Sequence, residues 1–328
     1  MTTQTHPRLV FGTGNVGDSK VDPLVRFDTP EQVEAVLDSF HARGHREIDT
    51  AQVYSVHAFG TSEPRLGAAR AGDKFLLDTK VESRSAGDHK KENVLRNIDV
   101  SLERLKVDSV NILYLHQPDR TVPFEETCKA LNTAFKEEKF KSWGLSNYSA
   151  EEVEKIVEIC DSHQWKRPSI YQGQYNPIVR GAEKDLFPVL RKYGMSYYAY
   201  SPAAAGFFAG NHKNVVPGGR YDTSHFLGKF YADRYLNDGV QSASATALSE
   251  AEEHGISGHA AALRWCAYHS ALKAGNGDAI IIGASSVAQL ESNLDMIDQG
   301  PLPEDVAAAM GAVYKQVELA DAEIAYHW

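Results

Sequence analysis

The stretch RLVFGTGNVGDSKVDP, Arg8–Pro23, decides between two α/β folds. Its three glycines match the G-x-G-x-x-G pattern of Rossmann domains, and Asp49 ends what reads as the next strand. That fingerprint requires a helix to begin at its glycines, because the helix N-terminus receives the pyrophosphate. No helix pattern follows Gly17, and the first start signal is TPEQ at 29–32, with an N-cap threonine and a proline at N1. We therefore predict a loop after the first strand and another role for Asp49.

Short β-rich segments alternate with amphipathic helical segments along the chain. The helical segments carry start signals of their own, such as the capping box from Ser149 to Glu152. Eight strand-plus-helix units favour a closed (β/α)8 TIM barrel, with a doubly wound parallel sheet as the rival. The predicted strands are 9–12, 46–49, 75–80, 110–115, 142–146, 169–174, 196–201 and 279–284.

The alternation breaks after the seventh predicted strand, between Ser201 and Gly239. This stretch is rich in glycine and aromatic residues, and loops of such length are usually functional or disordered. Because the aromatic residues argue against disorder, we predict a lid or cofactor clamp, with a packed surface excursion as the alternative. No linker or internal repeat is visible, so residues 1–328 are expected to form one domain.

Composition and charge narrow the function classes. The formal net charge of −10 disfavours nucleic acid or an anionic membrane surface as a partner. No apolar run approaches the ~20 residues that a membrane span needs, and the N-terminus lacks a signal sequence, so the cytoplasm is the expected location. The cysteines have no C-x-x-C spacing and are expected to be buried free thiols. They are Cys128, Cys160 and Cys266.

Polar residues at the ends of predicted strands are the candidates for chemistry, because strand C-termini converge on one face of a barrel. The candidates are Asp49, Tyr54, Lys80 and His116. Each alone has a structural explanation, as a turn cap, a packing residue, a solvated side chain or a core histidine. Together they form a proton-transfer unit, since a lysine ammonium makes a tyrosine a useful acid near neutral pH. The aspartate would hold the lysine, and the histidine would orient a carbonyl oxygen.

Longer motifs run from the first strand to the C-terminus. They are IDTAQVYS, LHQPD, WGLSNYSAEEV, YQGQYNPIVR, LFPVLRKYGMSYYAYSP, IIIGASSVAQLESNL and IDQGPLP. With them the chain resembles the aldo-keto reductase superfamily, and within it the aflatoxin aldehyde reductase branch, which includes succinic semialdehyde reductases. The resemblance implies a (β/α)8 barrel, an NADPH cofactor and the family's catalytic tetrad at Asp49, Tyr54, Lys80 and His116.

The resemblance also implies a cofactor site. Ser146, Asn147 and Gln172 match residues that bind the nicotinamide amide, and Tyr200 matches the residue that stacks on its ring. The implied set also includes Ser201, Pro202, Gly206, Arg220, Gly283, Ser285, Ser286, Gln289 and Asn293. Backbone amides at Ser285 and Ser286 would bind phosphate, with Gln289 and Asn293 on one helix face. GASSVAQLESN lacks the basic residues that many relatives place against the 2′-phosphate, which leaves Arg220 as the basic candidate.

We interpret the chain as an NADPH-dependent carbonyl reductase that acts on a small-molecule aldehyde or ketone. The candidate substrate residues are Phe59, Trp143, Phe208, Tyr231 and Arg234. SPAAAGFFAG departs from the branch, which changes the surface beside substrate and pyrophosphate. No metal is expected, because the His41 and His45 pair has no third ligand. The resemblance implies that a homodimer can form. Two rivals are a cofactor-binding regulatory subunit of the potassium-channel β type and a dehydratase or isomerase with the same tetrad.

Overall fold

The loop after the first strand is where the two candidate folds separate. The structure is a computed structural model, and it describes residues 6–327. After β1 (Arg8–Gly12), none of the described residues is helical until α1 (Pro30–Ala42). Thr29 caps α1 by accepting from the Gln32 backbone, and the Gln32 side chain accepts from the Thr29 N–H at 3.2 Å. The Rossmann interpretation is therefore excluded, and the predicted helix start is confirmed.

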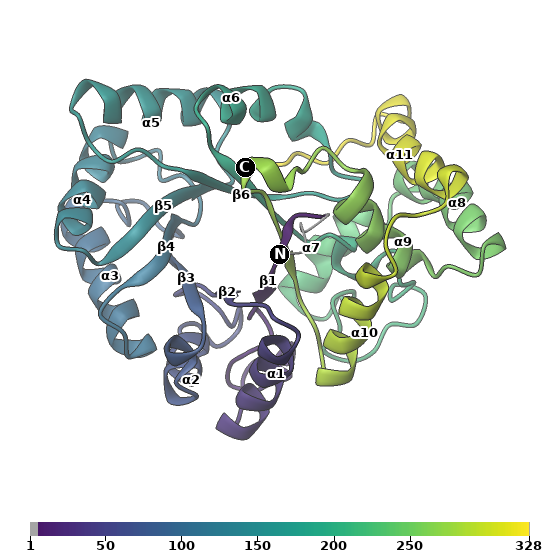
Figure 1. The fold of residues 1–328 in the computed structure, drawn as a ribbon, viewed down its shortest axis with the longest axis horizontal. Helices are drawn as coiled ribbons and strands as arrows, with labels where there is room; N and C mark the ends of the chain where they lie inside the picture. Colours follow the sequence, from purple (N-terminus) through teal and green to yellow (C-terminus); the bar gives the residue numbers. More distant parts are fainter. Residues whose placement is uncertain (1–5, 328) are drawn as a thin grey trace.

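Eight parallel strands close into a barrel in sequence order, with β8 paired to β1 (Figure 1). The predicted TIM-barrel fold is confirmed, and each predicted strand is present with its ends shifted by no more than two residues. The strands are β1, β2 (Glu47–Asp49), β3 (Leu76–Val81), β4 (Val110–Leu115), β5 (Phe140–Ser146), β6 (Ile170–Gln174), β7 (Ser196–Tyr200) and β8 (Ala279–Ile282).

The helices cover the outside of the barrel, and Figure 1 shows α8 and α11 lying side by side at its periphery. The predicted capping box at α5 is present, with the Ser149 and Glu152 side chains each accepting from the other residue's backbone. The bounds are α2 (Ser62–Ala68), α3 (Lys91–Leu105), α4 (Phe124–Lys136), α5 (Ala150–Ser162), α6 (Leu186–Lys192), α7 (Phe226–Tyr235), α8 (Asp238–Glu253), α9 (Gly258–Arg264), α10 (Val287–Asp298) and α11 (Glu304–Leu319).

Apolar side chains form two separate layers, because successive strand residues point to opposite faces. A large layer fills the space between the strands and the helices, and it includes the buried free thiols of the three cysteines, as predicted. A small layer closes the barrel interior. Its members are Val10, Ile112, Tyr114, Ile170, Tyr198, Ala279 and Ile281. In each strand, alternate side chains face the barrel interior. The last of these inward-facing side chains therefore points into the open end of the barrel.

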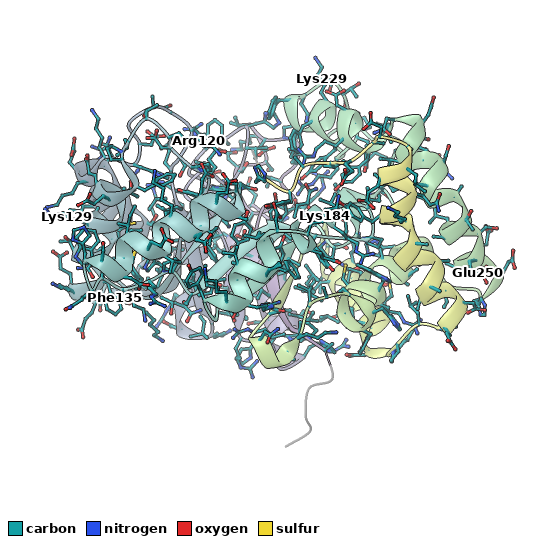
Figure 2. All side chains as sticks on the ribbon, turned by 90° about the horizontal axis from the view of Figure 1, so that it is seen from above. Arg120, Lys129, Phe135, Lys184, Lys229 and Glu250 are labelled. Atoms are coloured by element: carbon teal, nitrogen blue, oxygen red, sulfur yellow. The ribbon has the colours of Figure 1, made fainter. Side chains whose placement is uncertain are left out.

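The segment after β7 contains more regular structure than the sequence indicates. It begins with a short 3-10 turn at Ala204–Gly206 and includes α7, whose N-cap His225 accepts from the Gly228 N–H. In the side view of Figure 2, Lys229 of α7 lies at the same end of the molecule as Arg120, which follows β4. This is the end at which the parallel strands finish. Over residues 6–327, none of the helices combines the length and the apolar character that crossing a membrane requires.

Candidate active site

Four polar side chains converge at the carboxyl ends of neighbouring strands. Asp49 ends β2, Lys80 lies in β3, and His116 directly follows β4. Tyr54 lies in the irregular segment between β2 and α2. The structure thus brings together the four residues that the sequence places at strand ends.

Lys80 is the centre of this group. Its side chain has no solvent exposure, and Nζ lies 2.8 and 2.7 Å from the two carboxylate oxygens of Asp49. The same nitrogen donates to the Thr50 carbonyl at 2.7 Å and to the Tyr54 hydroxyl at 3.2 Å. Burial lowers the pKa of Lys80, and the negative charge of Asp49 opposes that shift. The result is an ammonium that lies beside a phenol in a water-poor site.

Tyr54 and His116 face one another across the site. Their rings meet edge to face, with centroids 5.9 Å apart. Burial raises the pKa of Tyr54 well above its usual value, and the Asp49 charge adds to that shift, so the phenol keeps its proton at neutral pH. Burial, with the Lys80 charge second, lowers the pKa of His116 to about 3. His116 is therefore neutral at neutral pH and can donate a hydrogen bond without carrying a charge.

A second pair of acids, Glu47 and Asp78, lies deeper in the barrel. Glu47 is two residues before Asp49 in β2, and Asp78 is two residues before Lys80 in β3. Asp78 is fully buried, and its Oδ1 accepts from Asn111 Nδ2 at 2.8 Å and from the Ile112 N–H at 3.1 Å. Burial first, and the charge of Glu47 second, raise the pKa of Asp78 well above its usual value. Burial and the neighbouring Glu47 charge thus both disfavour the charged form of Asp78 beneath Lys80. This pair was not expected from the sequence, although the two-residue period of a strand places it on the inner face.

The amide side chains assigned to the nicotinamide lie next to the tetrad and bond to it. Gln172 Nε2 donates to Asp49 Oδ1 at 2.8 Å. Asn147 Nδ2 donates to the His116 carbonyl at 2.9 Å and to Ser146 Oγ at 3.0 Å. The Tyr200 hydroxyl donates to Asn147 Oδ1 at 3.1 Å. These contacts place an amide cluster and an aromatic ring at one wall of the site.

The turn after β7 approaches the same wall. Ser201 has a left-handed backbone with φ of 55°, and its carbonyl accepts from Asn176 Nδ2 at 3.0 Å. The Pro202 carbonyl accepts weakly from the Cys266 thiol at 3.6 Å. Gly206 has φ of 89°, a conformation that favours glycine. These residues set the backbone conformation at the start of the segment that leads from β7 to α7.

The turn between β8 and α10 forms the other end of the predicted cofactor site. Ser286 caps α10 by accepting from the Gln289 N–H at 3.1 Å, and the Gln289 side chain accepts from Ser285. Asn293 differs from the expectation, because it is only 3% exposed and both ends of its amide are occupied. Its Nδ2 donates to the Gly283 carbonyl at 3.1 Å, and its Oδ1 lies 2.9 Å from His259 Nε2. Gln289 is exposed and Asn293 is buried beneath the turn, so the two do not form one open face.

Arg220 links three segments at the open end of the barrel. Its Nη2 donates to Asn15 Oδ1 at 2.9 Å, and Asn15 Nδ2 donates to the Ala284 carbonyl at 2.9 Å. Its Nη1 lies 3.5 Å from the Tyr231 hydroxyl. The guanidinium is near enough to Tyr54 that its charge opposes the rise of the Tyr54 pKa. Arg220 therefore lies between the tetrad and the β8–α10 turn. The role of Asn15 as its partner was not evident from the sequence.

Two of the five predicted substrate residues lie outside the site. Trp143 has no solvent exposure, packs in the layer between strands and helices, and donates from Nε1 to the Lys166 carbonyl at 2.8 Å. Phe208 is 3% exposed and packs in that same layer against Phe207. Neither side chain is accessible to a substrate in this structure, because both are buried.

The other three predicted substrate residues are partly or largely accessible. Phe59 is 52% exposed, and the Arg84 guanidinium lies 3.8 Å from its ring centroid. Tyr231 contacts Arg220 and lies near enough to Tyr54 to influence its pKa. Arg234 Nη2 donates to Gln174 Oε1 at 3.2 Å and to the Ala325 carbonyl at 2.7 Å, so its charge is directed toward the C-terminal segment.

Comparison with known proteins gives a consistent result across the chain. The model of the aldo/keto reductase family matches residues 8–315. An aldo-keto reductase of Pseudocercospora fijiensis is 39% identical over 293 residues, which cover 87% of this chain and 98% of the relative. Aldo-keto reductase family 7 member A3 of Homo sapiens is 35% identical, covering 96% of each chain. Aflatoxin B1 aldehyde reductase member 2 of Homo sapiens is 37% identical, covering 97% of this chain and 89% of the relative.

Proposed function

Because the chain belongs to the aldo/keto reductase family, we propose that it is an NADPH-dependent reductase of aldehydes or ketones with Tyr54 as the proton donor. One observation supports this function above the others. The Lys80 ammonium is fully buried and contacts both Asp49 and the Tyr54 hydroxyl. A buried lysine held by one carboxylate against one phenol provides a positioned acid and a positive field at the same point.

The division of roles follows from the charges of the four side chains. Tyr54 is neutral and can give its proton to a carbonyl oxygen, and Lys80 stabilises the phenolate that remains. Asp49 fixes the lysine nitrogen with two bonds of 2.7 and 2.8 Å. His116 is neutral and can donate to the same carbonyl oxygen as it gains negative charge.

The residues around the tetrad fit a nicotinamide dinucleotide. Gln172 and Asn147 place amide groups beside Asp49 and His116, which suits a carboxamide with one acceptor and two donors once Asn147 exchanges its bonds to Ser146 and Tyr200 for the ligand. Arg220 provides a guanidinium between this wall and the N-terminus of α10, where the Ser285 N–H would have to exchange its bond to Gln289 Oε1 for a phosphate oxygen. When bound, the cofactor supplies the hydride that reduces the carbonyl carbon.

The preference for NADPH over NADH is assigned to Arg220. The protein carries a net charge of −10, so a cofactor with an additional phosphate needs local positive charge. Arg220 forms no ion pair among residues 6–327, and its hydrogen-bond partners are the neutral side chains of Asn15 and Tyr231. Its charge is therefore available for a phosphate group. The substrate side of the proposed site is formed by Tyr231 and the exposed ring of Phe59.

The test combines a substrate panel with one isosteric substitution. The wild-type protein is mixed with NADPH and with aromatic aldehydes, carboxylated short aldehydes and polyketide-like dicarbonyls, and NADPH absorbance is followed. For the best substrate, deuteride transfer from deuterated NADPH is measured in a single turnover. Tyr54→Phe should bind NADPH as the wild type does, by tryptophan fluorescence, but transfer should nearly vanish.

The matched control is Tyr171→Phe. Tyr171 is also a buried tyrosine, but its hydroxyl donates to the Tyr148 carbonyl at 2.7 Å in the layer between strands and helices. This variant should reduce the substrate at the wild-type rate. Transfer by Tyr54→Phe at near the wild-type rate would contradict the assigned proton donor. A wild-type protein that binds NADPH tightly but reduces no carbonyl in the panel would favour a regulatory or non-reductive role.

A further inference from the structure

Asp22 is a fully buried carboxylate in the loop between β1 and α1. The ion pairs of residues 6–327 include none to this side chain. Its partners are hydrogen-bond donors instead: Oδ1 accepts from the Leu24 N–H at 2.9 Å, and Oδ2 accepts from the Ser55 hydroxyl and from the His57 N–H at 3.2 Å. Burying a carboxylate without a cation costs several kcal/mol, so its bonds must be well made for it to remain in this place.

Two of the three partners belong to the segment that carries Tyr54. Ser55 directly follows the tyrosine, and His57 is three residues away. The backbone of Tyr54 itself is held by two bonds, from its N–H to the Ala51 carbonyl at 3.1 Å and from the Ser62 N–H to its carbonyl at 3.2 Å. The segment between β2 and α2 contains no regular element, so these contacts position the tyrosine in place of a helix or strand.

The β1–α1 loop and the segment that carries Tyr54 also pack closely against each other at Gly17. A Cβ atom on Gly17 would lie 2.5 Å from Ser55 Cβ and 3.0 Å from Thr61 Oγ1. No side chain fits there without a shift of the tyrosine segment. The Asp18 N–H also donates to Thr61 Oγ1 at 3.1 Å. The β1–α1 loop therefore contacts the tyrosine segment along its length, and Asp22 supplies the charged contact.

We propose that Asp22 is a positioning residue for Tyr54, which fixes the phenol against Lys80 through its bonds to Ser55 and His57. This inference rests on the proposed function. The Tyr54 hydroxyl lies 3.2 Å from Lys80 Nζ, near the outer limit of a hydrogen bond, so a small displacement of the segment breaks this contact. A displacement of about 1 Å at a reacting group can cost roughly a hundredfold in rate.

The experiment compares Asp22→Asn and Ser55→Ala with the wild type. The asparagine side chain keeps the shape of the aspartate, but it loses the charge and turns an amide NH2 group toward donors. We expect hydride transfer in a single turnover to slow by about 10- to 100-fold in Asp22→Asn, with the Kd for NADPH within about twofold of the wild type. Ser55→Ala removes one bond only and should slow transfer by a smaller factor, and the double variant should be scarcely slower than Asp22→Asn.

The matched control is Asp278→Asn. Asp278 is also buried and also accepts backbone N–H groups, from Tyr197 at 2.8 Å and from Lys273 at 2.7 Å, but it lies before β8 at the other end of the barrel. Unlike Asp22, it also forms an ion pair with Arg191, 2.6 Å from Nη2, so its loss of stability should be at least as large. This variant should lower the Tm and leave the transfer rate unchanged. Amide hydrogen exchange gives a readout that does not depend on activity, since Asp22→Asn should speed exchange in residues 54–61 and not in β7.

The outcomes separate the two proposals. A wild-type protein that reduces no carbonyl contradicts the proposed function, whatever the variants do. An active wild type with full transfer rates in both Asp22→Asn and Ser55→Ala contradicts the positioning role alone. Equal losses of rate in Asp22→Asn and Asp278→Asn would show a general effect of stability and would also overturn it. If Asp22→Asn fails to fold, Ser55→Ala with unchanged rate and unchanged exchange in residues 54–61 decides against the inference.

Discussion

Replacing Lys80 by methionine tests the site through stability as well as through activity. The lysine and Asp49 form an ion pair in which the side chains are 0% and 2% exposed. Methionine has a similar length and no charge, so it fills the space of the lysine and removes all four contacts of Nζ. Asp49 would then keep the bond from Gln172 Nε2 at 2.8 Å and its contact with the Tyr54 hydroxyl, neither of which carries a positive charge.

The expected cost comes from the carboxylate that is left behind. Removing one partner of a buried ion pair typically destabilises a protein by about 3–5 kcal/mol. An unfolding entropy of about 2.1 cal/mol/K per residue gives roughly 0.7 kcal/mol/K for 328 residues. The Tm of Lys80→Met should therefore fall by about 4–7 °C. Carbonyl reduction should fall to the level of Tyr54→Phe, because the phenolate that forms during proton transfer has lost its cation.

A second substitution separates the lost charge from lost packing. In Lys80→Met/Asp49→Asn the carboxylate is gone, and the remaining amide can still accept from Gln172. This double variant should recover at least half of the lost Tm and none of the activity. The measurements are thermal unfolding by fluorescence and single-turnover hydride transfer. If the double variant is less stable than Lys80→Met, or if the Tm of Lys80→Met is indistinguishable from that of the wild type, the account of a stranded buried charge is wrong.

The remaining predictions concern the cofactor and the pH dependence of stability. Arg220→Ala should weaken NADPH binding by about 10- to 100-fold, the loss of one charged hydrogen bond, and weaken NADH binding far less. Equal losses in fluorescence titrations with the two cofactors would remove Arg220 from the 2′-phosphate. Burial lowers the pKa of His89 to about 4 and that of His116 to about 3. Below pH ~6.5 these histidines therefore become protonated in the unfolded chain while they stay neutral in the folded protein. As the pH is lowered below ~6.5, the free energy of unfolding should fall by about 1.4 kcal/mol per pH unit for each histidine, until the pH reaches the pKa of that histidine in the folded protein. Urea unfolding at a series of pH values should give a slope for His89→Gln that is smaller than the wild-type slope by the contribution of one proton.

The fold was predictable because its signals are local. The capping boxes that begin α1 and α5 need only residues within one helical turn, and both are formed as expected. The strands were found from short apolar runs, and their closure followed from the number of strand-plus-helix units. The helix α7 was missed, because it lies among glycine and aromatic residues without an apolar period, and its N-cap is the unusual His225.

The substrate residues were harder to predict, because they depend on which way a side chain points. Trp143 lies in β5 three residues before Ser146, and residues an odd number apart on a strand face opposite sides of the sheet. If Ser146 lies at the site, Trp143 must face the helices. This orientation could have been predicted from the spacing of the two residues in the sequence. For Phe208 no such parity rule exists, because the segment after β7 turns irregularly before it packs. Its burial depends on long-range contacts that one sequence does not reveal.

The glycines of Arg8–Gly17 show how a motif can match in letters and differ in function. A Cβ on Gly12 would lie 2.9 Å from Ile281 Cγ2, so this glycine allows β1 and β8 to approach within the barrel. Gly17 allows the loop to contact the segment of Tyr54. In a Rossmann domain the corresponding glycines admit a pyrophosphate and a helix, whereas here they admit other parts of the same chain. Glycine spacing alone therefore indicates that another group packs closely against the backbone. It does not show whether that group is a cofactor phosphate or another segment of the same chain. The residues after the last glycine decide between the two, since a helix start favours a phosphate and a buried acid such as Asp22 favours an internal contact.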